Sequence, residues 1–295
     1  MSMAEKIIIV SRSDNVAAVP QISIRSRSNN KNATQMYETV RNHLLRRHNS
    51  FELRLTTSEA RSYTESYNDL PFFLVNRACS YKKPFIYNDY DYLRRSVRKI
   101  ACKIMYNASQ VTINYEIEYL TTLSQEDQID RVLQALFKEK DAYKIQYDFQ
   151  KIKFAYDFII ANVQYDKSLT KHSAYDALIG KSAVCEGCAN LLYRILSMFG
   201  IPCRIVTGKG LRESHAWNIV RLNGKWYNMD VTWDLYKSAI ERNLSLYSYF
   251  LKGSDTFHDH VRDLEYATSE FVSKHPMSNI DFQPQRRFKD LFRFK

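Results

Sequence analysis

Three side chains in the second half of the chain could together carry out nucleophilic catalysis: Cys185, His215 and Asp230. A thiol attacks a carbonyl carbon once a base has taken its proton, and a carboxylate can hold the basic imidazole in one tautomer. The three groups can act only if the fold brings them together. The elements predicted to carry them therefore decide whether the hypothesis is sound.

Cys185 is predicted to begin a helix. The helical pattern after it ends at Gly200, and Ile201-Pro202 follows, as expected just beyond a helix C-terminus. The helix is apolar on nearly all sides, so it should be buried. A cysteine in its first turn lies at the positive end of the helix dipole, which favours the thiolate, and backbone N–H groups there could stabilise an oxyanion. The apolar positions are Ala189, Leu192, Ile195 and Phe199.

A hairpin is predicted after this helix. Segments 203–207, 215–222 and 225–233 are expected to be strands, and the last two are joined by Asn223-Gly224. Asn-Gly is the strongest short signal for a two-residue hairpin turn, because both residues readily adopt positive φ. The turn fixes which residues of the two strands face each other.

The register of this hairpin would bring the histidine and the aspartate together. Counting outward from a two-residue turn places Trp217 opposite Asp230 and His215 opposite Thr232. His215 and Asp230 are then diagonal neighbours on one face of the sheet. The carboxylate could hold one ring nitrogen of His215 while the other nitrogen faces the thiol of Cys185.

This part of the chain resembles the transglutaminase-like superfamily of papain-like cysteine enzymes, in particular its bacterial-type members. The resemblance rests on SAYDALIGKSAVCEGCANLLYRILSMFGIPCRIVTG and on SHAWNIVRLNGKWYNMDVTWD. It implies that Cys185 is the nucleophile, His215 the general base and acid, and Asp230 the orienting carboxylate. It also implies an α+β fold in which the nucleophile helix packs on an antiparallel sheet. Gly187 and the helix exit at Gly200 match the family as well.

The resemblance implies a cysteine-dependent amide hydrolase, a peptidase or a deamidase, that acts on a protein or peptide through a thioester acyl-enzyme. A protein-glutamine transamidase with the same triad is the first alternative, because an amine can replace water in the second step. A catalytically inactive member of the fold that binds or scaffolds partners is the second. No metal and no cofactor are expected.

Four residues near the triad are candidates for the substrate cleft. Trp217 adjoins the histidine in sequence, Ser173 and Tyr175 shortly precede the cysteine, and Gly187 follows it. A tryptophan or tyrosine can form the wall of a cleft, and a hydroxyl can donate a hydrogen bond to an oxyanion. We therefore expect these residues to line the site.

Two other patterns could indicate metal or redox chemistry. Cys185 and Cys188 form a Cys-x-x-Cys pair, which could be a redox couple or half a zinc site. No second cysteine pair and no βαβ setting accompany it, so we favour neither function. His258 and His260, in FHDH, have a spacing that a metal could use, but no clear set of further ligands exists and we interpret them as structural.

Most of the net charge of +11 lies at the two ends of the chain. Residues 1–55 carry +5 and residues 286–295 carry +4. No recognised nucleic-acid motif accompanies them, so we do not expect the folded body to bind nucleic acid. The longest apolar run near the N-terminus, Ile7 to Val10, is too short for a signal-peptide core or a membrane span, so a cytoplasmic location is expected. With five cysteines, a disulfide framework is not expected.

The chain is expected to comprise four parts: a disordered basic segment at 1–35, an α/β region at 36–120, the transglutaminase-like catalytic domain at 121–285 and a basic tail at 286–295. Periodicity predicts further elements, namely helices at 36–47 and 143–163 and strands at 50–55 and 111–119. Ser124 and Asp127 have the spacing of a capping box, which predicts that another helix begins there.

Overall fold

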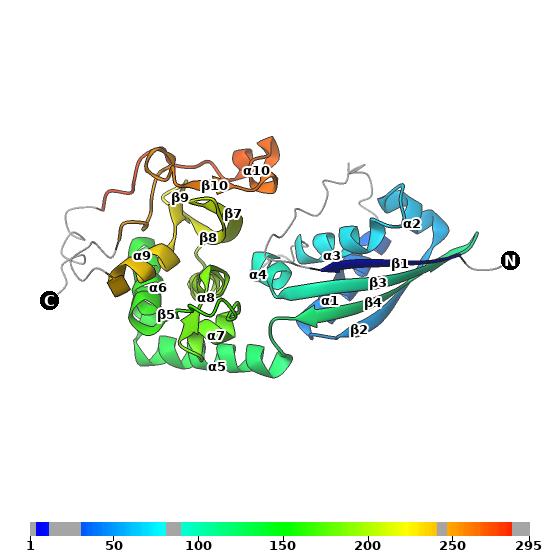
Figure 1. The fold of residues 1–295 in the computed structure, drawn as a ribbon, viewed down its shortest axis with the longest axis horizontal. Coiled ribbons are helices and arrows are strands. Elements are labelled where there is room, and N and C mark those ends of the chain that lie inside the picture. The colour runs from blue at the N-terminus through cyan, green and yellow to red at the C-terminus, as the bar shows by residue number, and fades with distance from the viewer. Residues whose placement is uncertain (1–3, 12–30, 81–89, 241–246, 285–295) are drawn as a thin grey trace. The chain divides into compact units, whose positions relative to one another are not determined.

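A computed structural model describes residues 4–11, 31–80, 90–240 and 247–284. The chain divides into two compact units, Met1–Gln125 and Glu126–Lys295, whose elements are labelled in Figure 1. Residues 4–11 form a strand and residues 31–35 are helical, so these parts of the segment predicted to be disordered are ordered. Residues 12–30 and the basic tail at 286–295 lie outside the described residues. None of the described helices is long and apolar enough to cross a membrane.

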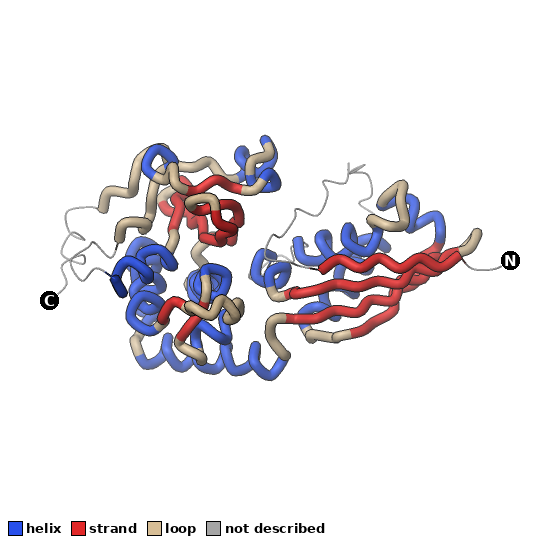
Figure 2. The backbone as a smooth tube through the Cα atoms, viewed as in Figure 1, coloured by secondary structure: helices blue, strands red, loops and turns tan. Residues whose placement is uncertain are grey.

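The first unit is built on an antiparallel sheet with strand order β1-β3-β4-β2, seen side by side in Figure 2. Apolar side chains of the sheet form one core with those of helices α1 and α3. The elements are β1 (Ala4–Ser11), α1 (Lys31–Leu45), β2 (Ser50–Thr56), α2 (Thr57–Tyr63), α3 (Leu70–Ser80), α4 (Tyr90–Arg95), β3 (Val97–Tyr106) and β4 (Gln110–Tyr119).

The alternation that predicted two of these strands is confirmed. In β2 every second residue is buried, namely Phe51, Leu53 and Leu55. In β4 the apolar residues of the alternating pattern are likewise buried up to Ile117. One face of the sheet is therefore covered, which is the physical origin of a two-residue hydrophobic period.

The helix expected from Ser124 and Asp127 begins slightly earlier, as α5 (Leu123–Glu139). The predicted capping pair is wrong. Instead, the backbone N–H of Gln125 donates to Oγ1 of Thr122 at 3.2 Å, and the backbone N–H of Thr122 donates to Oε1 of Gln125 at 2.9 Å. Thr-x-x-Gln satisfies the capping box as well as Ser-x-x-Asp, so the sequence offered two starts and the structure uses the first.

The second unit combines helices with a four-stranded antiparallel sheet of order β10-β7-β8-β9 and a short parallel pair, β5 and β6. The helix predicted at 143–163 starts later, because residues 142–144 form a separate 3₁₀ turn. The elements after α5 are α6 (Asp148–Asn162), β5 (Gln164–Tyr165), α7 (Ala174–Leu178), β6 (Ser182–Ala183), α8 (Cys185–Met198), β7 (Cys203–Gly210), β8 (Glu213–Leu222), β9 (Lys225–Met229), α9 (Val231–Ile240), β10 (His260–Arg262) and α10 (Ser269–Lys274).

Helix α8 has the bounds and the burial that the sequence predicted. It begins at Cys185, and Gly200 follows it with φ +68°, the left-handed conformation that ends many helices. Most of its residues are buried against the rest of the unit. In β8, Asn218 is buried and donates through Nδ2 to the carbonyl of Ala189 at 3.1 Å. Helix α8 therefore packs on the antiparallel sheet, as the α+β fold class requires.

The hairpin has the predicted register but a shorter second strand. Pairs run from Leu222–Lys225 to Asn218–Met229, as a two-residue turn dictates. Strand β9 then ends at Met229, and helix α9 follows where a strand to residue 233 was predicted. The expected pairing of His215 with Thr232 is therefore wrong, because the chain turns into a helix immediately after Asp230.

Gly224 offers a test of the hairpin. It has φ +81°, and a Cβ atom there would meet nothing within 4 Å. Gly224→Ala should therefore lower the free energy of unfolding by about 1–2 kcal/mol, through backbone strain alone. Gly224→Asn should lower it less, because asparagine tolerates the left-handed region. Urea denaturation of the two variants checks this, and equal stability of wild type and Gly224→Ala would contradict the turn.

Candidate active site

His215 and Asp230 form a buried pair. Nε2 of His215, on β8, lies 2.7 Å from Oδ2 of Asp230, which immediately precedes α9. Their side chains are 8% and 1% exposed. The pair that the hairpin register predicted is thus brought together, although the aspartate sits at the start of a helix and not in a strand.

Asp230 is surrounded by hydrogen-bond donors. Its Oδ1 accepts from the backbone N–H groups of Thr232 at 3.0 Å and Trp233 at 3.2 Å, the pattern of a helix N-cap. Its Oδ2 accepts from His215 and also from Nε2 of His260 at 3.0 Å. Both oxygens are therefore occupied, and the carboxylate is fixed in orientation. Sequence reasoning did not place His260 in the site.

Cys185 lies on the other side of the imidazole. It is half-buried at the first residue of α8, and its side chain lies close enough to His215 to raise the pKa of that imidazole. Because Asp230 occupies Nε2, the ring nitrogen left for the thiol is Nδ1. The first backbone N–H groups of a helix have no acceptor within the helix, and Cys185 is the first residue of α8. The three residues predicted to form a triad therefore lie within one contact network.

The charges of this network support one another. Burial alone would lower the pKa of His215, but the adjacent Asp230 carboxylate and the Cys185 side chain outweigh burial and raise that pKa to about 10. Burial alone would raise the pKa of Asp230, but His215 and His260 outweigh burial and lower it. The buried pair is therefore an imidazolium beside a carboxylate, and each charge favours the other.

Gly210, at the end of β7, leaves room for the imidazole. A Cβ atom there would lie 2.8 Å from Cζ2 of Trp233 and 3.2 Å from Cδ2 of His215. The rings of His215 and Trp233 have centroids 5.4 Å apart. The absence of a side chain at this position therefore lets the tryptophan and the histidine pack closely beside the backbone.

Two of the cleft candidates have contacts that explain them structurally. Ser173 caps α7, with its Oγ accepting from the backbone N–H of Asp176 at 3.1 Å in a capping box. Gly187 faces backbone, since a Cβ atom there would lie 2.9 Å from the carbonyl oxygen of Ser173 and 2.7 Å from Cβ of Ala183. The glycine thus lets the first turn of α8 approach the preceding loop.

The other two candidates are also held by the fold. Trp217 is only 1% exposed, and its ring lies 6.1 Å from that of His215. Tyr175 is half-buried and donates to Oε1 of Gln128 at 3.1 Å. Trp217 therefore forms the wall behind the imidazole, with no surface open to a substrate in this conformation.

Cys185 differs from the other cysteines, all of which belong to the described part of the chain. It alone is not buried. Burial raises the pKa of Cys188 to about 12, as it does for Cys79 and Cys102. Cys188, whose Sγ faces the carbonyl of Ala183 at 3.9 Å, is therefore a packed thiol and a poor nucleophile at neutral pH.

His215, Asp230 and His260 are also close enough together to raise the question of a metal. Within the described residues, their ligand atoms all lie within 4.8 Å of one another. Both histidine nitrogens, however, face the same carboxylate oxygen at hydrogen-bond distance. That geometry assigns the group to a hydrogen-bond network.

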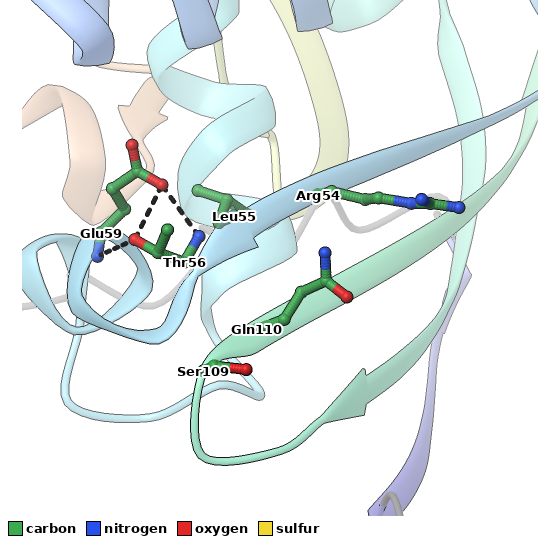
Figure 3. A pocket seen from close by; sticks show the side chains of 6 residues that line it. All are labelled: Arg54, Leu55, Thr56, Glu59, Ser109 and Gln110. Atoms are coloured by element: carbon green, nitrogen blue, oxygen red, sulfur yellow. Dashed lines mark hydrogen bonds between the residues drawn. The ribbon is translucent and has the colours of Figure 1, made fainter.

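A hollow in the first unit offers no comparable chemistry. Figure 3 shows its lining residues, among them Thr56 and Glu59, whose side chains point toward each other. These two form the capping box of α2, with the Thr56 backbone N–H donating to Oε2 of Glu59 at 2.8 Å. The hollow therefore holds a structural cap and contains neither a thiol nor a histidine. Its full lining is Arg54, Leu55, Thr56, Glu59, Ser109 and Gln110.

Comparison with known families places the site in a matched region. Residues 138–231 match the model of the transglutaminase-like superfamily, and this range includes Cys185, His215 and Asp230. Human kyphoscoliosis peptidase is 26% identical over 168 residues, which cover 49% of this chain and 25% of that protein. The mouse protein of the same name is 28% identical over 139 residues, covering 39% and 21%. The chain thus spans about a quarter of the length of these curated relatives.

Two solved structures are similar at low identity. A crystal structure of a TGase is 16% identical, with a TM-score of 0.34 and coverage of 52% of this chain and 49% of that one. A candidate cysteine protease from Cytophaga hutchinsonii is 17% identical, with a TM-score of 0.33 and coverage of 73% and 70%. Scores this low carry no argument about the site.

The raised pKa of His215 predicts how stability depends on pH. The native state keeps a proton that the unfolded chain releases near pH 6.5. The stabilisation is therefore fully present below about pH 6.5 and is lost as pH rises through about 10. The difference in free energy of unfolding between wild type and His215→Gln should thus shrink between pH 6 and pH 10.5, by an amount on the order of a few kcal/mol.

Urea titrations at several pH values measure this difference. His258→Gln is the matched control, because His258 is exposed, and it should follow the wild type at every pH. A difference between wild type and His215→Gln that stays constant across the range would contradict the buried ion pair.

Proposed function

Since this chain carries a domain of the transglutaminase-like superfamily, we propose that it is a cysteine-dependent amide hydrolase, either a peptidase or a deamidase. Cys185 is the nucleophile, His215 the general base and acid, and Asp230 the orienting carboxylate. The observation that carries the proposal is the 2.7 Å hydrogen bond that fixes Nε2 of His215 on Asp230 and leaves Nδ1 for the thiol.

The first half of the reaction forms an acyl-enzyme. In the resting enzyme the thiol proton of Cys185 has already passed to Nδ1 of His215, which is why His215 is an imidazolium. The thiolate sulfur then attacks the carbonyl carbon of a substrate amide. The negative charge moves to the carbonyl oxygen, where N–H groups of the first turn of α8 can stabilise it. The C–N bond then breaks, Nδ1 returns its proton to the leaving amine, and the acyl group remains on Cys185 as a thioester.

The second half releases the acyl group. A water molecule gives its proton to His215 and attacks the thioester, and the thiolate leaves with the carboxylic acid as product. If the amide is a backbone amide, the reaction is peptidolysis. If it is the side chain of glutamine or asparagine, the products are a carboxylate and ammonia. If a primary amine attacks the same thioester in place of water, a new amide bond forms and the reaction is a cross-linking one.

Asp230 explains why the imidazole can serve both halves. Its carboxylate accepts a hydrogen bond from the Nε2–H group of His215, so Nε2 keeps its proton and Nδ1 is the nitrogen that exchanges one. Its negative charge also stabilises the imidazolium that exists between the two proton transfers. An inactive member of the fold could keep the same three residues and serve only to bind partners, but its cysteine would not be reactive. The reactivity of Cys185 therefore distinguishes an enzyme from an inactive scaffold.

Hydrolysis is favoured over amine transfer by the relatives. The human and mouse proteins that match this chain are both named peptidases. A protein or peptide is therefore the proposed substrate, and water the proposed acceptor.

Alkylation of the five cysteines tests the nucleophile. At pH 6, iodoacetamide should modify Cys185 at least about tenfold faster than Cys203, and His215→Ala should remove that advantage, because the imidazole no longer stabilises the thiolate. Site-resolved mass spectrometry measures each rate, with His258→Ala as the control that retains fast labelling. Equal rates at Cys185 and Cys203 in the wild type would leave the inactive scaffold as the better explanation.

A substrate assay separates the possible reactions. An unfolded protein such as casein, incubated with a fluorescent primary amine, should yield new amino termini or free ammonia in excess of incorporated amine. Cys185→Ala should reduce all products by about 10³-fold or more, since no other group can form the thioester. Amine incorporation that exceeds hydrolysis would show a transamidase instead, and the ratio of termini to ammonia separates peptidase from deamidase.

A further inference from the structure

We propose that His260 is a positioning residue for this reaction: it holds the carboxylate of Asp230 in the orientation that receives His215. This inference rests on the proposed function and deepens it. His260 does not contact the reacting atoms, and it acts through Asp230. No local pattern distinguishes His260 from His258, which lies two residues earlier.

His260 is held between two carboxylates. Its Nε2 lies 3.0 Å from Oδ2 of Asp230, and its Nδ1 lies 2.7 Å from Oδ1 of Asp259. The hydroxyl of Tyr249 donates to the other oxygen of Asp259 at 2.6 Å. Ionised carboxylates only accept hydrogen bonds, so a ring that faces one at each nitrogen must donate from both. His260 thus presents one ring nitrogen to each carboxylate, and Asp230 accepts from Nε2.

Aromatic rings fix the plane of the His260 imidazole. Phe257 stacks on it at 3.9 Å between centroids with an interplanar angle of 18°, and Trp233 lies at 4.2 Å. Trp217 meets it edge-on at 4.9 Å. The side chain of His260 is completely buried. This enclosure leaves the imidazole little freedom to rotate.

The close antiparallel pairing of β10 with β7 positions His260. Strand β10 pairs with β7 so that His260 faces Gly210 and Arg262 faces Gly208. A Cβ atom at position 208 would lie only 2.0 Å from the carbonyl oxygen of Val261. A side chain at position 208 would therefore push β10 away and carry His260 with it.

His260 has two effects on the pair that it supports. It anchors Oδ2 of Asp230, and its N–H group offsets part of the negative charge that His215 experiences. The lowered pKa of Asp230 reflects both histidines. The charged or titratable groups around His260 are Asp230, Asp259 and His215, with Tyr249 bonded to Asp259. Without His260, Oδ2 of Asp230 would keep only His215 as a partner, and the less compensated carboxylate charge would hold the proton of His215 more strongly.

The test compares three variants with the wild type. His260→Leu removes both N–H donors of the ring, whereas His260→Gln retains a side-chain amide that can still donate a hydrogen bond. His258→Leu is the control at the exposed neighbouring histidine. Each is assayed for native secondary structure by circular dichroism and for the rate of Cys185 alkylation between pH 5 and pH 10.5. Hydrolysis of casein supplies kcat and KM.

For folded His260→Leu, we expect alkylation of Cys185 to slow by about tenfold or more at its optimum and its alkaline limb to move to higher pH. Hydrolysis should lose kcat with little change in KM, and His260→Gln should recover part of the rate. His258→Leu should match the wild type. A residue that only fills space would change stability without moving the pH profile.

A profile of folded His260→Leu that superimposes on that of the wild type would overturn the inference. If His260→Leu does not fold, the test rests on His260→Gln. A pH profile of Cys185 alkylation in His260→Gln that equals that of the wild type would then overturn the inference. Failure of the proposed function has a different signature, because Cys185 in the wild type would then react slowly and without dependence on His215.

Discussion

The structure of the second unit depends on the burial of one charge, the carboxylate of Asp230. A buried carboxylate is tolerated only when donors or cations replace the water that it has lost. Asp230 meets this requirement with two backbone N–H groups at the start of α9 and two imidazoles, from β8 and β10. Three elements distant in sequence must therefore converge on one side chain, and the imidazole of His215 is oriented as a consequence.

A second carboxylate secures the helix that Asp230 caps. Asp234 is fully buried one turn into α9, and Tyr156 of α6 donates to its Oδ2 at 2.6 Å and to the carbonyl oxygen of Asp230 at 3.0 Å. The backbone N–H of Tyr249 also donates to Asp234 at 2.9 Å. The start of α9 is thereby tied to α6 and to the segment that precedes β10. Such redundancy suits an orienting group, because a small rotation of the carboxylate would move the imidazole away from the thiol.

Much of the site could be predicted because its determinants are local. The limits of α8 follow from an apolar helical period and a glycine stop, and the hairpin register follows from a two-residue turn at Asn223-Gly224. Each of these signals lies within a few residues of the chain, so it can be recognised without knowledge of the fold. Together they predicted the adjacent elements that carry Cys185, His215 and Asp230. The start of α5 shows the limit of local signals, because two residue pairs with capping-box spacing, Thr122 with Gln125 and Ser124 with Asp127, begin only two residues apart.

The sequence by itself determined the α+β class, the helix that begins at Cys185 and the pairing of β8 with β9. Only the tertiary structure decided that β9 ends before Asp230, because the carboxylate can cap α9 only where the chain leaves the sheet. It also decided that His260 belongs to the site while His258 remains exposed. The pairing of β10 with β7 joins segments about fifty residues apart. Such a contact is selected by the packing of the whole unit, and no local period or turn residue encodes it.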